Sequence, residues 1–132
     1  SWVDFRDKRK GKCLDVTGGN NANGTKVQLH SCNGSPAQQW YFDPVKGTLK
    51  SQLVGNKCLD IPNGNTSNGT QLQIWDCQEG NTNQQFNKNG SVFSARINSN
   101  YVIDASGKNS GDPIVMWEYH GGDNQKWRAG LN

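Results

Sequence analysis

The feature that most constrains the fold is an internal repeat with a period of 45 residues, the spacing from Cys13 to Cys58. The segment KCLDVTGGNNANGTKVQLHSC, which begins at Lys12, matches KCLDIPNGNTSNGTQLQIWDC, which begins at Lys57. Both copies keep two cysteines, an Asn-Gly-Thr triplet between them and an alternating apolar segment after the triplet. A fixed period in the forties is typical of stacked or closed repeat folds. One structural unit is therefore used at least twice.

A third copy follows about 44 residues after the second and lacks cysteines. Its apolar segments lie at 101–104 and 114–117, and Val102 and Tyr119 occupy the two cysteine positions. Each copy continues into a glutamine-containing segment that ends in an aromatic residue: Trp40, Phe86 and Trp127. We therefore expect one domain, 1–132, with repeats at about 1–45, 46–90 and 91–132.

Composition and turn signals indicate that each unit is made of strands. Glycine occurs 16 times and only 32% of residues are apolar, which gives too many turn formers for a helical protein. Short apolar runs alternate with Gly, Asn and Pro clusters, and no apolar period of 3.6 extends over a helix length. The fold class is therefore all-β. Five Asn-Gly pairs are expected to supply the positive φ of tight hairpins: Asn23-Gly24, Asn33-Gly34, Asn63-Gly64, Asn68-Gly69 and Asn89-Gly90.

Three copies of about four short strands predict a compact β barrel with three-fold pseudosymmetry. A propeller has a similar period, but it needs at least about four blades to close. The equivalent aromatic residues Trp40, Phe86 and Trp127 are expected to meet in the core near the pseudo-three-fold axis.

The cysteine spacing predicts two disulfides, Cys13–Cys32 and Cys58–Cys77, because the other pairings would break the repeat symmetry. Each would close an equivalent loop and contribute about 3 kcal/mol in the chain-entropy model. A metal site would need closely spaced cysteine pairs, which the sequence lacks, so neither metal nor cofactor is expected. Disulfides indicate an oxidising compartment, so we expect a secreted or extracellular protein.

The net charge of +3 is concentrated in the segment 6–12. We interpret this segment as a solvated turn before the first repeat, with a patch for phosphate or acidic glycans as the alternative. Cations are not spread along a face with interleaved aromatics, so nucleic acid is not an expected partner. No apolar stretch is long enough for a membrane span, and no signal peptide is visible at the start. The ends carry no linker, which suggests a domain excised from a longer chain.

The repeated Cys-Leu-Asp start, the apolar segment before the second cysteine position and the Gln-x-aromatic ending resemble the ricin B-type β-trefoil. The similarity extends from about Lys12 to Trp127. Members of this family are lectins and family 13 carbohydrate-binding modules attached to glycoside hydrolases. The resemblance implies a twelve-strand trefoil with up to three shallow sugar pockets, each with an aspartate, a polar strand residue, an aromatic platform and an amide pair. Such a set suits sugars, because an aromatic ring packs on the apolar sugar face and carboxylate and amide groups bind hydroxyls.

The second repeat carries the complete set: Asp60, Gln73, Trp75, Asn83 and Gln84. The third keeps most of it, with an aliphatic Val115 at the polar position: Asp104, Trp117, Asn124 and Gln125. The first repeat has His30 at the platform position and Ala37 at the asparagine position, and it keeps the remaining residues: Asp15, Gln28 and Gln38. The resemblance thus ranks the pockets second, third, first.

Structural roles compete with sugar contact at several of these positions. The aspartates could fix turns through side-chain hydrogen bonds, most of all Asp15. The glutamines Gln38, Gln84 and Gln125 could bond the backbone and the aspartate instead of a ligand. Trp75 and Trp117 are interpreted as exposed platforms, because three other aromatic residues already supply the core.

An enzyme is not expected, because the aspartates occur once per repeat while a glycosidase needs two carboxylates across one bond. His30 and His120 lie in no metal-binding motif; His30 is interpreted as a degenerate platform and His120 as a loop residue. The expected partners are glycans or polysaccharides bound multivalently, galactosides first and xylan-type chains next, with a covalently linked catalytic domain if the chain is a module. The alternative is a protein-recognition or protease-inhibitor trefoil. Five Asn-x-Ser/Thr triplets leave N-glycosylation open.

Overall fold

The computed structural model describes residues 1–9 and 11–130, which form twelve strands and five short 3₁₀ turns. The strands are β1 (Phe5–Asp7), β2 (Cys13–Val16), β3 (Val27–His30), β4 (Trp40–Asp43), β5 (Thr48–Ser51), β6 (Lys57–Asp60), β7 (Gln73–Asp76), β8 (Phe86–Asn89), β9 (Val92–Ala95), β10 (Asn98–Ala105), β11 (Ile114–Glu118) and β12 (Trp127–Ala129). The 3₁₀ turns are η1 (Thr17–Gly19), η2 (Pro36–Gln38), η3 (Pro62–Gly64), η4 (Thr82–Gln84) and η5 (Asp123–Gln125).

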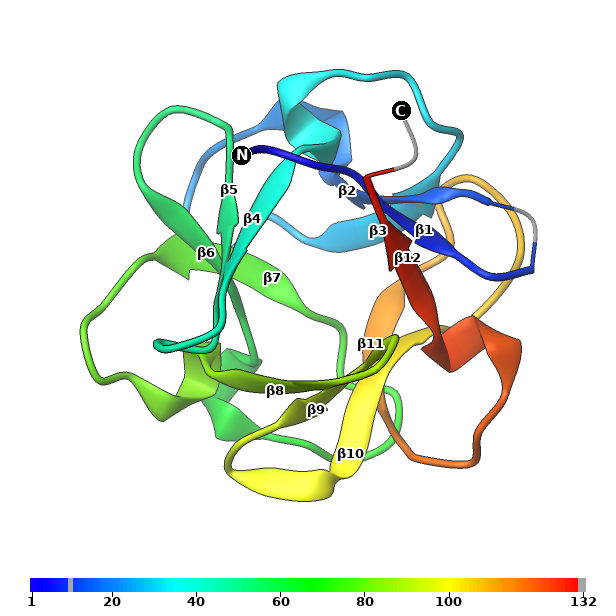
Figure 1. Ribbon diagram of the computed structural model, residues 1–132. Coiled ribbons are helices and arrows are strands. Elements are labelled where there is room, and N and C mark those ends of the chain that lie inside the picture. Colours follow the sequence, from blue (N-terminus) through cyan, green and yellow to red (C-terminus); the bar gives the residue numbers. More distant parts are fainter. Residues whose placement is uncertain (10, 131–132) are drawn as a thin grey trace.

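The strands form three four-stranded sheets arranged around a common core, as Figure 1 shows. Their orders are β12-β1-β2-β3, β4-β5-β6-β7 and β11-β10-β9-β8. The predicted all-β trefoil is confirmed. The sheets are shifted by one strand from the sequence repeats, since β4 leaves the first repeat to join the second sheet. Likewise β12 of the third repeat pairs with β1, with Phe5 opposite Ala129, so the two ends of the chain close the ring together.

The aromatic endings of the repeats lie in the core. Trp40 and Phe86 are completely buried and Trp127 is 3% exposed, which confirms their predicted burial. The indole Nε1 atoms of Trp40 and Trp127 donate to the carbonyls of Leu14 (3.1 Å) and Ile103 (3.2 Å). These bonds satisfy the only polar atom that each buried indole carries.

Both predicted disulfides are present. Cys13 is bonded to Cys32 and Cys58 to Cys77, with Cα–Cα distances of 5.2 and 5.0 Å. The first disulfide joins the start of β2 to the segment after β3, and the second joins the start of β6 to the segment after β7. In the third repeat Val102 is buried at the first cysteine position, whereas Tyr119 is exposed at the second.

The expectation that the Asn-Gly pairs form tight hairpins is wrong for four of the five pairs. All five glycines have positive φ, but only Asn89-Gly90 joins two neighbouring strands directly, where Asn89 pairs with Val92. Asn63-Gly64 lies in η3, and Asn33-Gly34 precedes η2. In the other two pairs, the glycine N–H donates to a strand of the next repeat. The local signal for positive φ is reliable, but what such a turn connects depends on packing.

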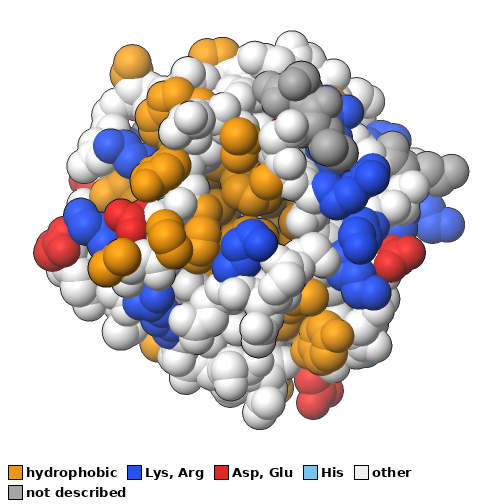
Figure 2. All heavy atoms as spheres, in the orientation of Figure 1, with side chains coloured by type: hydrophobic (Ala, Val, Ile, Leu, Met, Phe, Trp, Pro, Cys, Tyr) orange, Lys and Arg blue, Asp and Glu red, His pale blue; other side chains and the backbone are white. Residues whose placement is uncertain are grey.

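The basic segment 6–12 is not simply a solvated turn, although its residue 10 lies outside the described residues. Arg6 lies in β1 opposite Arg128, and its guanidinium bonds the buried Asp4 at 3.1 Å. Arg9 bonds the buried Asp7 at 2.9 Å and donates to the carbonyl of Gly107. In Figure 2, Lys and Arg side chains gather on the side where Figure 1 places β1 and β12. No helix in the described part of the chain is long and apolar enough to cross a membrane.

Candidate functional site

The three predicted pocket aspartates occupy equivalent places near the ends of β2, β6 and β10. The carboxylates are almost buried, with 5% of Asp15, 5% of Asp60 and 3% of Asp104 exposed. Strand register sets each opposite the polar position of the neighbouring strand: Asp15 opposite Gln28, Asp60 opposite Gln73, and Asp104 opposite Val115. Side chains directly opposite in an antiparallel pair share a face, so each aspartate and its strand partner point to the same side.

A fully buried glutamine holds each carboxylate from behind. The Nε2–Oδ2 distances are 2.8 Å for Gln38 and Asp15, 3.0 Å for Gln84 and Asp60, and 2.9 Å for Gln125 and Asp104. The amide oxygens accept from the backbone of the loop after the platform strand: the N–H groups of Asn33, Gln78 and His120. Because these glutamines are completely buried, they orient the carboxylates, as the structural interpretation of the sequence expected, and do not face the solvent where a sugar would lie.

The glutamines are in position because each Gln-x-aromatic ending folds as a 3₁₀ turn followed by a strand. In η4 the side chain of Asn81 accepts from the N–H of Asn83 at 2.9 Å and starts the turn. In η2 a proline occupies the first position, where its missing N–H costs nothing. These turns could not be predicted from the sequence, since three residues are too few to show a helical period.

The two predicted platforms lie on the strand next to each aspartate and are exposed. Trp75 in β7 is 38% exposed and Trp117 in β11 is 39% exposed. Each follows the polar position by two residues, so it points to the same face as the aspartate. The interpretation of both as surface residues agrees with their burial. His30, at the same place in β3, is half-buried, and its Nδ1 lies 3.2 Å from the carbonyl oxygen of Ser31.

Each platform strand is supported by a loop of the preceding repeat, a contact that the sequence analysis missed. The amide of Gly24 donates to Ile74 at 2.8 Å, and a Cβ at Gly24 would lie 3.8 Å from the Trp75 ring. Gly69 bonds Met116 (2.9 Å) and Gly111 bonds Leu29 (2.7 Å) in the same way. A side-chain oxygen of the residue before each glycine accepts from the strand end: Asn23 from Asp76, Asn68 from Glu118, and Ser110 from Ser31. The pockets are therefore built at the seams between repeats.

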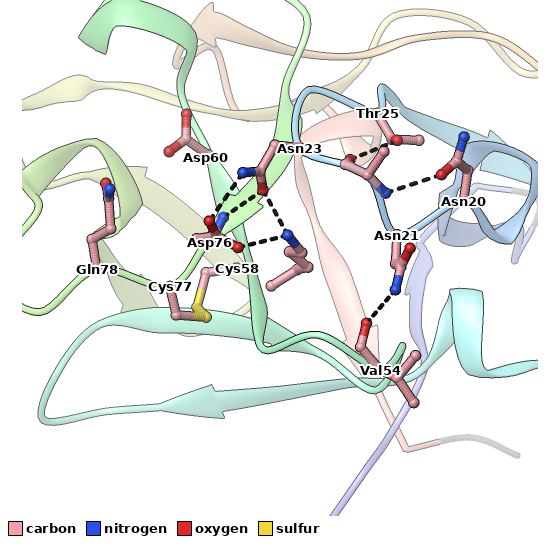
Figure 3. A network of polar contacts seen from close by, with 12 residues as sticks. Asn20, Asn21, Asn23, Thr25, Val54, Cys58, Asp60, Asp76, Cys77 and Gln78 are labelled. Atoms are coloured by element: carbon pink, nitrogen blue, oxygen red, sulfur yellow. Dashed lines mark hydrogen bonds and ion pairs between the residues drawn. A yellow bond between two sulfur atoms is a disulfide. The ribbon is translucent and has the colours of Figure 1, made fainter.

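The seam beside the second pocket carries an additional ionic network, shown in Figure 3. Lys57 Nζ lies 2.6 Å from Asp76 Oδ1 and donates to Asn23 Oδ1 at 2.8 Å. Asn23 Nδ2 donates to Asp76 Oδ2 at 3.0 Å. The hydrogen bonds from Lys57 and Asn23 hold the pKa of Asp76 below its usual 3.8, since both stabilise the ionised form. In the third repeat Tyr101 occupies the position of Lys57, and in the first repeat Ser31 occupies the position of Asp76. Among the described residues, this network therefore occurs at this seam only.

In the second pocket the carboxylate of Asp60 accepts two amides, Gln73 at Oδ1 and Gln84 at Oδ2, both at 3.0 Å. An ionised carboxylate has about four lone-pair sites, so acceptor capacity remains on the side of Trp75. The Asn83 backbone carbonyl accepts from Ile61 at 2.9 Å. Its side-chain oxygen would lie 2.7 Å from a Cβ at Gly64, so the positive-φ glycine leaves room for this amide at the pocket rim.

The third pocket differs because its amides converge on one oxygen. Asn124 and Gln125 donate to Asp104 Oδ2 at 3.0 and 2.9 Å, whereas Val115 offers nothing to Oδ1. Burial raises the pKa of Asp104 above its usual 3.8, and the hydrogen bond from Gln125 and the charge of His120 offset only part of the effect. A carboxylate with one unbonded oxygen can accept hydroxyl protons from a ligand.

His120 is a residue of the third pocket that the sequence analysis assigned to a loop. Its Nε2 lies 3.9 Å from Asp104 Oδ2, and its Nδ1 accepts from the amide of Gly122 at 3.1 Å. In the neutral ring this bond places the proton on Nε2, so an N–H points toward the pocket. The other repeats have Asn33 and Gln78 at this position, so no repeated signal could have identified it.

The first pocket keeps its carboxylate anchors and forms a cavity of about 340 Å³. Gln28 and Gln38 donate to Asp15 at 3.0 and 2.8 Å. His30 and Ala37 line the cavity where the other pockets have a tryptophan and an asparagine. The aspartate is thus held as in the other repeats, but the aromatic platform and the rim amide are missing.

Asp4, Cys13 and Cys32 are the only group of potential metal ligands that the described residues bring within 4.8 Å. Both sulfur atoms are bonded to each other, so this group does not form a metal site.

The chain matches the family model of the ricin-type β-trefoil lectin domain over residues 1–127. Among solved structures, the designed three-fold symmetric protein ThreeFoil is 29% identical, with 98% of this chain and 97% of that one covered and a TM-score of 0.87.

The C-terminal half of an earthworm R-type lectin, solved in complex with GalNAc, is 25% identical with a TM-score of 0.81 and coverage of 98% and 97%. The trefoil lectin of Vibrio vulnificus hemolysin, solved with N-acetyl-D-lactosamine, is 23% identical with a TM-score of 0.79 and coverage of 99% and 94%, and supports the fold. No curated protein matches the chain. With the trefoil architecture and the three equivalent aspartate pockets, the match over nearly its whole length shows that this chain belongs to the ricin-type β-trefoil lectins, a family of non-catalytic carbohydrate-binding domains.

Proposed function

We propose that the protein binds galactosides through the second and third pockets and engages glycans multivalently. The observation that carries this proposal is the pairing of a fixed carboxylate with an exposed tryptophan in these repeats. Asp60 faces the side of Trp75, and Asp104 faces the side of Trp117, with each carboxylate held by a buried glutamine. A ligand therefore finds acceptors that need no reorganisation.

The chemistry of the two pockets suits a pyranose. The sugar's apolar C–H face packs on the indole, while two hydroxyls donate to the remaining acceptor sites of the carboxylate. The rim amide of Asn83 lies beside the acceptors of the second pocket and offers donors to the ring hydroxyls. In the third pocket the amide of Asn124 already donates to Asp104 and to the carbonyl of Ala105, so it positions the carboxylate. GalNAc in the earthworm lectin, which is 25% identical, supports galactose or its N-acetyl derivative as the first ligand to test, with xylan-type chains next.

Each pocket alone binds weakly. A monosaccharide of about 12 heavy atoms at about 0.3–0.4 kcal/mol each gains about 4 kcal/mol, which corresponds to a Kd of about 1 mM. Two pockets that engage one polymer or clustered glycans gain a factor of about 10² to 10⁴ through effective concentration. The protein is therefore best suited to bind polysaccharides or densely glycosylated surfaces.

We further propose that the protein acts outside the cell, as a free lectin or as the targeting module of a secreted glycoside hydrolase of the family 13 module type. The two disulfides support an oxidising compartment. A targeting module needs weak, reversible and multivalent contacts, which shallow pockets provide.

The test is binding to an immobilised glycan panel that includes galactosides, GalNAc glycans and xylans. We expect the wild type to bind one sugar class, and both Asp60→Ala and Trp75→Ala to lower the apparent affinity, more for a polymer than for a monosaccharide. Trp2→Ala is the matched control, because Trp2 is 40% exposed and lies outside the pockets.

Thermal unfolding of each variant separates lost binding from lost folding, which matters for Asp60 because it is almost buried. Binding that survives both pocket substitutions, or a wild type that ignores every glycan, would refute the proposal. Equal losses for polymer and monosaccharide would refute multivalency alone.

A further inference from the structure

A groove with a cavity of about 370 Å³ lies beside the third pocket, outside the aspartate site. It is formed by the β8–β9 hairpin, the first half of β10 and the end of β11, which lie together in Figure 1. Its lining includes Asn89, Ser94, Asn100, Val102, Glu118 and Tyr119. None of these residues was assigned to a sugar pocket.

Strand register puts the groove on the same face of the sheet as the third pocket. Ser94 lies opposite Val102, and Val102 lies opposite Trp117, so these three side chains form one row across β9, β10 and β11. Asp104 follows Val102 by two residues and therefore shares its face. Trp117 thus stands between the aspartate pocket on one side and the groove on the other.

The far wall of the groove is an exposed aromatic residue. Tyr119 follows Trp117 by two residues, about 6.6 Å along the strand direction, and is 52% exposed. Its amide donates to the carbonyl of Asn100 at 2.8 Å, which extends the β10–β11 ladder and holds the ring at the groove. Its hydroxyl would lie 3.4 Å from a Cβ at Gly121, so the loop after β11 supports the ring from behind.

The polar side chains of the groove have no partner in the described part of the chain. The side chains of Asn89, Ser94, Asn100 and Glu118 take part in no hydrogen bond or ion pair with residues 1–9 and 11–130. Two amides, a hydroxyl and a carboxylate are thus available beside a tyrosine ring. This is the same kind of set that the aspartate pockets offer to a pyranose.

The equivalent place in the second sheet is chemically different. Cys58 and Cys77 occupy the positions of Val102 and Tyr119 and form a disulfide, and Lys50 lies opposite Cys58 where the third sheet has Ser94. In the first sheet the row contains Arg6 opposite Cys13 and Arg128 opposite Arg6, so two cations occupy this place. The groove at this place in the second sheet also contains a tyrosine, Tyr41, but several charged residues line it, among them Lys50, Glu79 and Arg96. The groove of the third sheet therefore differs in being almost free of charge, with Glu118 as the one charged residue in its lining.

Resting on the proposed function, we propose that this groove is an extension subsite that takes a second neutral sugar residue of a chain whose first residue occupies the Asp104 pocket. The chain crosses the edge of Trp117, and its next ring lies between Tyr119 and the row of Ser94 and Val102. Glu118 is the one charged residue in the lining, so it accepts hydroxyls and repels acidic sugars. The third repeat then recognises a linked neutral disaccharide, not only a terminal residue.

The test is calorimetric titration in a Trp75→Ala background, which leaves the third pocket as the main binding site. The probes are galactose with lactose, and xylose with xylotriose. We expect the longer member of the bound pair to bind more tightly than its monosaccharide. We also expect Tyr119→Ala to weaken the longer probe about tenfold and to leave the monosaccharide unchanged.

Tyr41→Ala is the control, because Tyr41 is an exposed tyrosine (41%) of the second sheet, and it should change neither affinity. Amide resonances of Ser94 and Asn100 should shift with the longer probe and not with the monosaccharide. If Tyr119→Ala weakens both probes equally, or neither, the extension subsite is refuted while the Asp104 pocket stands. If the background protein binds none of the four sugars but the wild type does, the third pocket and the subsite both fail; if the wild type also binds none, the proposed function fails with them.

Discussion

In the second repeat, the platform strand ends in a disulfide and in an ionic network of Lys57, Asp76 and Asn23, and the pocket carboxylate accepts one amide on each oxygen. In the third repeat a valine and a tyrosine replace the cystine, Tyr101 replaces Lys57, and both amides reach one oxygen of Asp104. The backbone contacts that support the two platforms are nevertheless the same, with amides of Gly24 and Gly69 bonding the neighbouring strand at 2.8 and 2.9 Å. Main-chain geometry maintains the pocket, while side chains decide how rigid it is and how far it extends.

The largest difference between the two repeats should be in stability. Replacing Cys58 and Cys77 together by alanine should lower the free energy of unfolding by about 3 kcal/mol, because the unfolded chain regains the freedom of a loop with a sequence separation of 19. Urea denaturation with intact and substituted protein measures this change. The double substitution of Cys13 and Cys32, with the same separation, should cost a similar amount.

A cost near zero in either repeat would show that the fold does not depend on the covalent link. The converse substitution is Val102→Cys with Tyr119→Cys, which should raise stability and, by removing Tyr119, abolish the preference of the third repeat for longer sugars.

The next effect concerns acidification of the third pocket. Because burial raises the pKa of Asp104, the carboxylate takes up a proton at a pH above 3.8, and sugar affinity should fall as the pH drops through the raised pKa. The loss should be about tenfold, the value of one charge-assisted hydrogen bond. Titration of the Trp75→Ala protein with sugar across the acidic range measures it.

The positive charges of Arg9 and of protonated His120 favour the ionised form of Asp104. His120→Gln should therefore move the loss to higher pH. The same proton affects folding: between pH 3.8 and the raised pKa the folded state holds it while the unfolded state does not. Asp104 thus opposes folding above its raised pKa, and this penalty disappears as the pH falls toward 3.8. A third pocket insensitive to acid would contradict the assignment of Asp104 as the acceptor.

A smaller effect should follow from giving the third pocket the missing amide. Val115→Gln places a donor opposite Asp104, as Gln73 lies opposite Asp60. One additional hydrogen bond to the ionised form should lower the pKa of Asp104 and strengthen sugar binding about fivefold, for about 1 kcal/mol. Carboxyl NMR titration and calorimetry measure the two changes. The reverse substitution, Gln73→Val, should weaken the second pocket; if it does not, the amide at this position has no part in binding.

The smallest effect should appear at the exposed network of the second seam. Asn23→Ala removes one of the donors that lower the pKa of Asp76, so the pKa should rise toward 3.8, as NMR titration of the Asp76 carboxyl can measure. Asn68→Ala is the matched control, since Asn68 supports Glu118 in the same way at 2.7 Å but does not contact Asp76. Lys57→Met should raise the pKa further than Asn23→Ala, because Lys57 is the larger cause; the opposite order would contradict the network as drawn in Figure 3.

Much of the fold and part of the site could be predicted from sequence, because the three copies of the repeat allow equivalent positions to be compared within one chain. Equivalent positions identified the disulfides and the buried aromatic endings. The resemblance to ricin B-type trefoils pointed to the three aspartates and to Trp75 and Trp117 as surface residues. The sequence could not show whether the glutamines contact the ligand or orient the aspartates, because either role would use the same side-chain amide. His120 could not be predicted as a pocket residue, because the other repeats have no histidine at its position. The prediction for the Asn-Gly turns was wrong because Gly24 and Gly69 form hydrogen bonds with a different repeat.

Residue type and short-range spacing were sufficient to predict the number of units, their strand content and the covalent links, and the resemblance to ricin B-type trefoils pointed to the pocket aspartates. The three-dimensional arrangement was needed to show which repeat supports which pocket, that β4 and β12 join a neighbouring sheet, and that Tyr119 and Ser94 border one groove. Strand pairing and ring closure bring together residues that are far apart in the chain, and local sequence preferences do not predict such contacts.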